Sequence, residues 1–356
     1  FANTKTKYYQ NDKEIYMYEI EKKEMVRISN YCGDRVDYVQ GGGGNTSVKF
    51  DDKLMAIKAS GYTLKEATQD KGYVTVNYRN IKKYYNEVDP GADTDFEKES
   101  LLLNMDSIVL LDGMENKRPS VEVGLHSFLN RCVIHTHSVY ANMLCCAAEG
   151  QNIAKEIFAD SDISYVFVPY IDPGFRLTLV IKNAAEQYAA EHGSIPDAIF
   201  MINHGVITSN DDSEKAIELH ELVNDKIAEH FKLGAYPTLS ISKTADGFRS
   251  ETPYLKQFVK KFGGKDYLGN LKLYPDQLIY IGKRLGDAIK IDEQTGQVQY
   301  IASEKEANVI EETLMGAAFV INEITEAGLT LLQMNEDDAS FINNWESEAY
   351  RSKLAK

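Results

Sequence analysis

The amino-acid sequence predicts an α/β fold with a smaller α+β region at its C-terminal end. Short stretches rich in β-branched and aromatic residues, such as 45–50 and 73–78, alternate with helical patterns through residue 235. A polar segment at 236–252, rich in Ser, Thr, Lys and Gly, predicts a linker. Because 356 residues exceed the usual size of one domain, we expect a main domain and a smaller one.

The pattern of apolar residues predicts the individual elements. A glycine run at 41–44 opens the first group of strands, and Pro119-Ser120 is a helix start signal. Asp212 or Ser213 is expected to cap a long amphipathic helix. We expect strands at 45–50, 53–59, 73–78, 107–113, 132–138, 164–170 and 198–209 (bent or paired), and helices at 12–33, 121–130, 139–150, 177–193 and 212–231.

The last hundred residues predict a helix, a hairpin and further helices. The hairpin joins 288–292 to 297–302, with Gly296 as the turn residue. The sequence therefore divides into an N-terminal extension, a main α/β domain, a linker and a C-terminal α+β region, at 1–22, 23–235, 236–252 and 253–356.

The composition excludes several classes of protein. A formal net charge of -15 and a pI near 5.0 repel nucleic acid and anionic membranes, so neither is an expected partner. A site for an anionic ligand would need local positive charge. The four cysteines form no CxxC pair, and we expect them to be buried free thiols of a cytoplasmic protein.

The strongest local signal is the segment His135-Thr136-His137. Alternate residues of a strand point to the same face, so both imidazoles can chelate one metal ion. A catalytic zinc site usually takes three protein ligands, and His204, at the end of the apolar run 198–202, is the best third candidate. The alternative is that these are packed core histidines.

The remaining histidines have other expected roles. His126 lies four residues after Glu122 on the same helix face, and we interpret it as a packed or hydrogen-bonded residue behind the site. We expect His192, His220 and His230 to be surface or helix residues in charged surroundings.

Glu122 is the candidate acid/base. It lies in the first turn after Pro119-Ser120, where a carboxylate is also stabilised by a helix N-terminus, so a capping role is the alternative. If Glu122 lies beside the metal, it can exchange a proton with a substrate held there.

Two polar turns are candidates for anion binding. The glycine run ends at Asn45, and a second turn contains Lys58, Ser60 and Gly61. Glycines let the backbone approach a ligand, and exposed amides can form an anion-binding nest. Lys58 would supply the positive charge that the acidic chain otherwise lacks. Neither turn is a P-loop or a dinucleotide fingerprint, so plain loops remain the alternative.

Five blocks in order resemble the class II aldolase/adducin family. They are GGGGNTSVKF, IKASG, RPSVE, VIHTHS and INHGVIT, and the resemblance covers roughly residues 23–235. The first block and the long C-terminal extension are most similar to the aldolase part of rhamnulose-1-phosphate aldolase-type proteins. The resemblance implies a three-layer α/β/α domain with a central, mainly antiparallel sheet. It also implies a homo-oligomer, commonly a tetramer.

The resemblance assigns roles residue by residue. It implies zinc, or another divalent metal, held by His135, His137 and His204, with Glu122 as the catalytic acid/base. Asn45 matches a residue that helps to hold the substrate, and Ser60, Gly61 and Ser120 match phosphate-binding positions. Two departures concern the phosphate group, because Val121 and Gly42 stand where some family members carry hydroxyl residues.

The activity that the resemblance implies is a zinc-dependent carbon–carbon lyase. Such an aldolase cleaves a ketose 1-phosphate, or a related sugar phosphate, to dihydroxyacetone phosphate and an aldehyde through a zinc-stabilised enediolate. A sugar-phosphate dehydratase or epimerase of the same family is the first alternative, although Glu122 argues against an epimerase. A non-catalytic adducin-like binding module is the second, and the three histidines argue against it.

Overall fold

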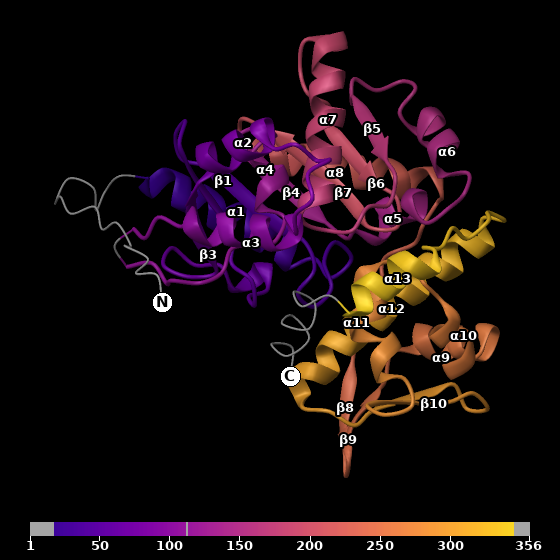
Figure 1. The fold of residues 1–356 in the computed structure, drawn as a ribbon. Helices are drawn as coiled ribbons and strands as arrows, with labels where there is room; N and C mark the ends of the chain where they lie inside the picture. Colours follow the sequence, from indigo (N-terminus) through magenta and orange to yellow (C-terminus); the bar gives the residue numbers. More distant parts are fainter. Residues whose placement is uncertain (1–17, 112, 345–356) are drawn as a thin grey trace.

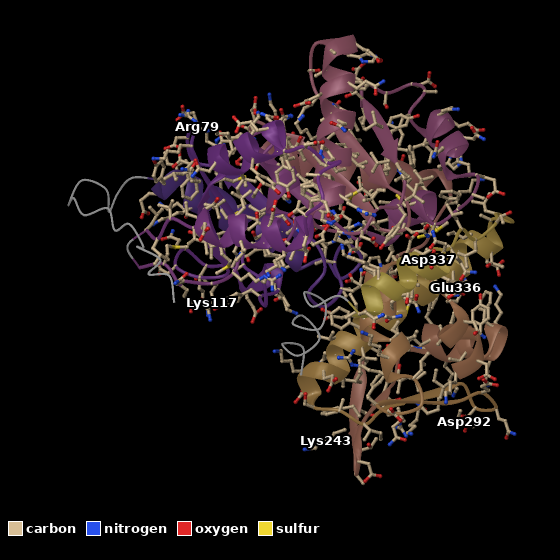
Figure 2. The ribbon with its side chains drawn as sticks, viewed as in Figure 1. Arg79, Lys117, Lys243, Asp292, Glu336 and Asp337 are labelled. Carbon is tan, nitrogen blue, oxygen red and sulfur yellow. The ribbon has the colours of Figure 1, made fainter. Side chains whose placement is uncertain are left out.

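The computed structural model describes residues 18–111 and 113–344. Figure 1 shows a large α/β part, coloured indigo to pink, above a smaller part coloured orange to yellow. Charged side chains such as Arg79, Lys243 and Asp292 lie at the outer edge of the molecule (Figure 2). Among the described residues, no helix combines the length and the apolar character needed to cross a membrane.

A seven-stranded sheet forms the centre of the large part. Its strand order is β3-β2-β1-β4-β7-β6-β5, and every neighbouring pair is antiparallel except β5 with β6. The expected central, mainly antiparallel sheet is therefore confirmed. Its strands are β1 (Asn45–Lys49), β2 (Leu54–Lys58), β3 (Tyr73–Asn77), β4 (Cys132–Thr136), β5 (Tyr165–Val168), β6 (Ala198–Met201) and β7 (Gly205–Asn210).

Helices cover both faces of this sheet, which gives the expected α/β/α layers. Side chains alternate along β4: Ile134 packs toward α1 and α8, whereas Val133 packs toward α4 and α7. One layer contains α1 (Glu19–Gly33), α5 (Val139–Cys145) and α8 (Ser213–His230). The other contains α2 (Tyr78–Glu87), α4 (Val123–His126) and α7 (Phe175–His192). The shorter elements η1 (Leu64–Glu66), α3 (Phe96–Asp106) and α6 (Gly150–Ile157) lie at the periphery.

The C-terminal region has its own four-stranded sheet, with the order β10-β11-β9-β8. Its strands are β8 (Ile241–Thr244), β9 (Gly247–Ser250), β10 (Ile289–Asp292) and β11 (Gln297–Tyr300). Its helices are α9 (Pro253–Phe262), α10 (Lys265–Asn270), α11 (Pro275–Tyr280), η2 (Gly282–Arg284), α12 (Glu304–Glu326) and α13 (Glu336–Asn344). The predicted hairpin is confirmed, with Gly296 at a φ of 74°.

The prediction of a linker at 236–252 is wrong, because β8 and β9 form a hairpin within that segment. Strand β9 then pairs with β11, so the hairpin belongs to the C-terminal sheet. The segment is polar because both strands keep much of their surface in contact with solvent. An antiparallel sheet with one solvated face needs polar residues at alternate positions, and composition alone does not separate such a strand from a loop.

Three other expectations need correction or completion. The strand expected at 107–113 does not form: Ile108 makes only an isolated bridge to Val76, and residue 112 lies outside the described residues. The helix expected at 121–130 is a single turn, α4. The helix expected at 12–33 is described from Glu19, which places it across the predicted boundary at residue 22, and 12–17 lie outside the described residues.

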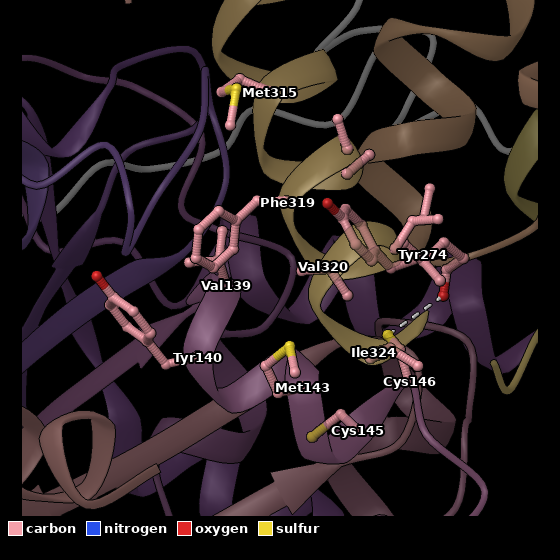
Figure 3. Close-up of a cluster of buried hydrophobic side chains, with 14 of the residues drawn as sticks. Val139, Tyr140, Met143, Cys145, Cys146, Tyr274, Met315, Phe319, Val320 and Ile324 are labelled. Carbon is pink, nitrogen blue, oxygen red and sulfur yellow. Dashed lines mark hydrogen bonds between the residues drawn. The ribbon is translucent and has the colours of Figure 1, made fainter. Parts of the chain in front are cut away.

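The two parts share one hydrophobic core. Helix α12 packs on α5, and Phe319 and Val320 meet Val139 and Met143 at this contact (Figure 3). All four side chains are buried. Burying a large apolar side chain stabilises by roughly 1.5–3 kcal/mol, so the C-terminal region is held firmly against the sheet domain. The expectation for cysteine is confirmed, because Cys32, Cys132, Cys145 and Cys146 are all free and buried.

His220 lies in helix α8, one of the two expected positions, and is fully buried there, whereas His192 and His230 are exposed. The His220 side chain shares the inner face of α8 with Ala216, Val223 and Ile227. Its two ring nitrogens bond the hydroxyl groups of Thr136 and Thr208 at 3.1 and 3.0 Å. His220 therefore ties α8 to the two central strands β4 and β7.

We expect the burial of His220 to make the fold sensitive to acid. Burial lowers the pKa of His220 to about 3, whereas an unfolded imidazole titrates near pH 6.5. The unfolded chain then binds the proton more tightly, so the free energy of unfolding falls as the pH drops below about 6.5. Urea unfolding of the metal-free protein at a series of pH values measures how the free energy of unfolding depends on pH. Between about pH 6 and pH 4, we expect this slope to be smaller in His220→Gln than in wild type by roughly 1 kcal/mol per pH unit. The exposed His192→Gln is the control, and equal slopes in wild type and His220→Gln would contradict the account.

Candidate active site

Three histidines meet at one end of the central strands. His135 lies near the end of β4, His137 just beyond it, and His204 in the tight turn between β6 and β7. Within this turn Asn203 has a φ of 52°, and Gly205 follows with a φ of 157°. A Cβ atom on Gly205 would lie 2.2 Å from the carbonyl oxygen of Thr136. Glycine is therefore required for β7 to approach β4 and carry His204 to the other two imidazoles.

The three imidazoles surround a common point. Their ring centroids are 5.0, 5.1 and 5.0 Å apart, and one nitrogen from each ring lies within 4.8 Å of the others. All three side chains are buried, at 0%, 4% and 3% exposure for His135, His137 and His204. The sequence pattern alone did not separate a metal site from core histidines, and this convergence favours the metal site.

The polar atoms of the cluster fit a divalent cation. Nδ1 of His135 lies 3.1 Å from the carbonyl oxygen of Val206, while its Nε2 has no hydrogen-bond partner among the described residues. Nδ1 of His204 and Oε1 of Glu122 are likewise buried without such a partner. Buried polar atoms are normally satisfied, so the unsatisfied Nε2 of His135 and Oε1 of Glu122, side by side in the cluster, indicate a ligand. Three imidazoles beside a carboxylate are a donor set typical of catalytic zinc.

Glu122 lies against the imidazole cluster. Its two carboxylate oxygens are 3.5 Å from Nε2 of His135 and 3.5 Å from Nε2 of His204. Glu122 stands at the start of α4, but its side chain makes no capping hydrogen bond there. The alternative capping role is therefore not the one that this side chain takes.

Burial sets the charge of the site. It lowers the pKa of His135 to about 4 and of His204 to about 3, so both rings are neutral near pH 7. Burial acts to raise the pKa of Glu122, but the three imidazoles and the amide of Asn45 lower it to about 2. The site thus combines neutral nitrogen donors with an ionised carboxylate.

A buried chain of hydrogen bonds orients Glu122. The amide nitrogen of Asn45 donates to Oε2 of Glu122 at 2.6 Å. The amide oxygen of Asn45 bonds Nε2 of His126, whose Nδ1 lies 2.7 Å from the hydroxyl of Ser47. His126 is fully buried, so its interpretation as a hydrogen-bonded residue behind the site is confirmed.

A cavity of about 570 Å³ opens beside the cluster. His137, His204 and Glu122 line it, whereas His135 is not among its lining residues. The other expected ligand-binding residues all lie on its wall: Asn45, Lys58, Ser60, Gly61 and Ser120.

The expected nest of backbone amides forms only in part. The amide of Ser60 donates to the carbonyl of Arg118, and the amide of Ser120 donates to the carbonyl of Lys58. These bonds hold the two turns together but leave those amides unable to bind an anion. The positive charge on the wall comes instead from side chains, namely Lys58, Lys65, Arg118 and Lys305.

The sequence did not predict several residues that line the cavity. Arg118 is the first residue of the recognised block RPSVE, and Lys65 lies four residues after the block IKASG. The positive charge of the two side chains was the one available signal. Pro275, Tyr280, Lys305, Asn308, Val309 and Glu312 of the C-terminal region also line the cavity. Glu312 accepts a hydrogen bond of 2.8 Å from the amide of Gly41, which ties α12 to the glycine run. No local pattern connects these residues to the histidines, because only the packing of α12 on α5 brings them there.

Comparison with known proteins identifies the family. The profile described as Class II Aldolase and Adducin N-terminal domain matches residues 23–229. The chain belongs to the class II aldolase/adducin family. The match includes all three histidines and Glu122, and it ends before the C-terminal region.

Individual relatives differ in how much of this chain they cover. "Uncharacterized oxidoreductase YuxG" of Bacillus subtilis (strain 168) is 31% identical over 230 residues, which are 60% of this chain and 31% of that protein. The chain thus spans about a third of that relative's length. The N-terminal class II aldolase domain of a conserved Thermoplasma acidophilum protein is 22% identical, with a TM-score of 0.49 over 63% of this chain and 98% of its own. L-fuculose 1-phosphate aldolase from Glaciozyma antarctica PI12 is 10% identical, with a TM-score of 0.38 over 91% of this chain and 96% of its own.

We expect the purified protein to bind about one zinc or similar divalent ion per chain. Three imidazoles that converge at one buried point supply the ligands, so His135/His137/His204→Ala should bind none. Metal content by mass spectrometry, after incubation with zinc and gel filtration, measures both. The variant His192→Ala, at an exposed position, is the matched control. Absence of metal from the wild type would rule out the site.

Proposed function

We propose that this chain is a divalent-metal-dependent aldolase that cleaves a ketose 1-phosphate to dihydroxyacetone phosphate and an aldehyde. The observation that carries this proposal is that Glu122 and two imidazoles of the buried three-histidine cluster line the same cavity as the cationic side chains of Lys58, Lys65, Arg118 and Lys305. Zinc is the metal that this donor set favours. Membership of the family supports the reaction class, and the sugar is left to experiment.

The metal ligands would be His135, His137 and His204. When bound, a divalent ion supplies Lewis-acid stabilisation of the negative charge that develops on the substrate oxygens. Burial keeps the imidazoles of His135 and His204 neutral, which is the form that binds a cation.

Glu122 would carry the proton. Cleavage removes a proton from the hydroxyl on C4, breaks the C3–C4 bond and later returns a proton to C3. Oε2 of Glu122 is occupied by the amide of Asn45, whereas Oε1 has no hydrogen-bond partner among the described residues. Glu122 is ionised, so Oε1 can accept the hydroxyl proton and deliver it to C3 in the same turnover.

Cationic side chains of the cavity would bind the phosphate group of the substrate. Lys58 and Arg118 lie beside Ser60, Gly61 and Ser120 on the cavity wall. Charge-assisted hydrogen bonds to phosphate are stronger than neutral ones, and they counter the repulsion expected from a chain with a net charge of -15. We further propose that the protein acts as a homo-oligomer, which light scattering would test.

Cleavage assays with a panel of ketose 1-phosphates, including L-fuculose and L-rhamnulose 1-phosphate, test the reaction. We expect dihydroxyacetone phosphate to form, and Glu122→Gln to lower kcat by about 10²- to 10⁴-fold while metal content stays near wild type. Glu115→Gln, outside the cavity lining, is the control.

Product analysis separates the alternative functions. Loss of water without C–C cleavage would favour a dehydratase, and metal-free, inactive protein would favour a binding module.

Removal of a cationic side chain should weaken binding of phosphorylated substrate. We expect Arg118→Met to raise KM for the ketose phosphate by roughly 10- to 100-fold, as the loss of a charge-assisted hydrogen bond implies. Lys117→Met is the matched control, because Lys117 is the adjacent cation and does not line the cavity. If both variants had the same KM, Arg118 would have no part in binding phosphate.

A further inference from the structure

We infer that Asp276 of the C-terminal region is the residue that positions His137 as a metal ligand. The inference rests on the metal site proposed above and adds a component from outside the family domain. Asp276 lies in the first turn of α11, beyond the matched residues 23–229. The C-terminal region would then be part of the metal site rather than an appendage to it.

The side chains of Asp276 and His137 are in direct contact and both are buried. Oδ2 of Asp276 accepts a short hydrogen bond from Nδ1 of His137. Asp276 is 0% exposed and His137 is 4% exposed. A hydrogen bond between a carboxylate and an imidazole N–H is strong when buried, so it fixes both the orientation and the tautomer of the ring.

The tautomer has a specific consequence for metal binding. With the proton on Nδ1 held by Asp276, the lone pair of His137 is on Nε2. His135 follows the same pattern, because its Nδ1 is held by the carbonyl of Val206 and its Nε2 has no partner among the described residues. Two of the three imidazoles therefore present the same nitrogen to the centre, each fixed through its other nitrogen.

The glycine run makes room for this pair. A Cβ atom on Gly43 would lie 2.5 Å from Oδ2 of Asp276 and 2.9 Å from Nδ1 of His137. Both distances are shorter than a side chain tolerates without displacement of its neighbours. The Gly43 position thus requires the absence of a side chain at the point where the two segments meet.

A second contact ties the C-terminal region to the turn that carries another ligand. The side-chain amide of Asn203, next to His204, donates to the carbonyl groups of Leu273 and Leu332 at 2.9 Å each. Leu273 lies three residues before Asp276, so one segment contacts the neighbourhood of two ligands. The packing of α12 on α5 holds this segment in place.

Zinc affinity of the full chain tests the inference. We expect Asp276→Ala to weaken zinc binding by about 10- to 100-fold, measured by competition with a chromogenic chelator. Asp276→Asn keeps the size of the side chain and should lie between Asp276→Ala and wild type, because the amide oxygen still accepts from Nδ1 without the charge. The visible absorption of the cobalt-substituted protein should also change in both variants, since it reports the geometry of the ligands.

Glu311→Gln is the matched control. Glu311 is also a buried carboxylate of the C-terminal region, but it bonds Ser250, Thr252 and Tyr300, away from the site. We expect Glu311→Gln to retain wild-type zinc affinity and cobalt spectrum. Circular dichroism establishes whether each variant is folded. If Asp276→Ala does not fold, the comparison of Asp276→Asn with wild type tests the inference.

The outcomes separate this inference from the proposed function. Wild-type zinc affinity and cobalt spectrum in Asp276→Asn would overturn the role of Asp276 and leave the metal site intact. An equal loss in Glu311→Gln would also overturn it, because the effect would then come from the folding of the region. Failure of the wild type to bind zinc would remove the metal site itself, and the proposed function with it.

Discussion

The close approach of the β6–β7 turn to the end of β4 is the contact on which the site depends. Gly205 lies against the carbonyl of Thr136 with no space for a Cβ atom. Because the turn is tight, His204 projects toward His135 and His137 instead of toward solvent. Three imidazoles are thereby buried together, an arrangement that is costly unless their nitrogens are satisfied. Burial keeps the rings of His135 and His204 neutral, and a neutral imidazole nitrogen can bind a cation.

A chain of hydrogen-bonded polar side chains behind the cluster orients the carboxylate of Glu122. Ser47, His126 and Asn45 bond in sequence and end on one oxygen of Glu122. Antiparallel pairing of β1 with β4 sets Asn45 opposite His135, so the same sheet positions both the amide and one imidazole of the cluster. Glu122 therefore accepts a hydrogen bond from Asn45 at Oε2, while its Oε1 has no hydrogen-bond partner among the described residues.

The C-terminal region gives the cavity its second wall. The contact of α12 with α5 is hydrophobic and extensive, and it brings Asp276 to His137 and Glu312 to the glycine run. The packing of this region and the chemistry of the site are therefore coupled. The family domain supplies the three histidines and Glu122, whereas the C-terminal region supplies the carboxylate that orients one of those histidines.

The sequence by itself determined the α/β character, most strands of the central sheet and the residues of the cluster formed by Glu122 and the three histidines. These signals are local: alternation in a strand places His135 and His137 on one face, and a glycine marks the turn beside His204. It did not distinguish a polar hairpin from a linker at 236–252, and it did not predict that His220 is buried. Charged neighbours of His220 obscured its apolar face at Ala216, Val223 and Ile227.

Only the tertiary structure decided which distant groups complete the site. Asp276 lies 139 residues from His137 in the chain, and no periodicity or spacing links them. The same holds for Lys305, Asn308 and Glu312 on the cavity wall. Their positions follow from the burial of α12 against α5, a contact between apolar surfaces that is non-directional and leaves no local motif in the sequence.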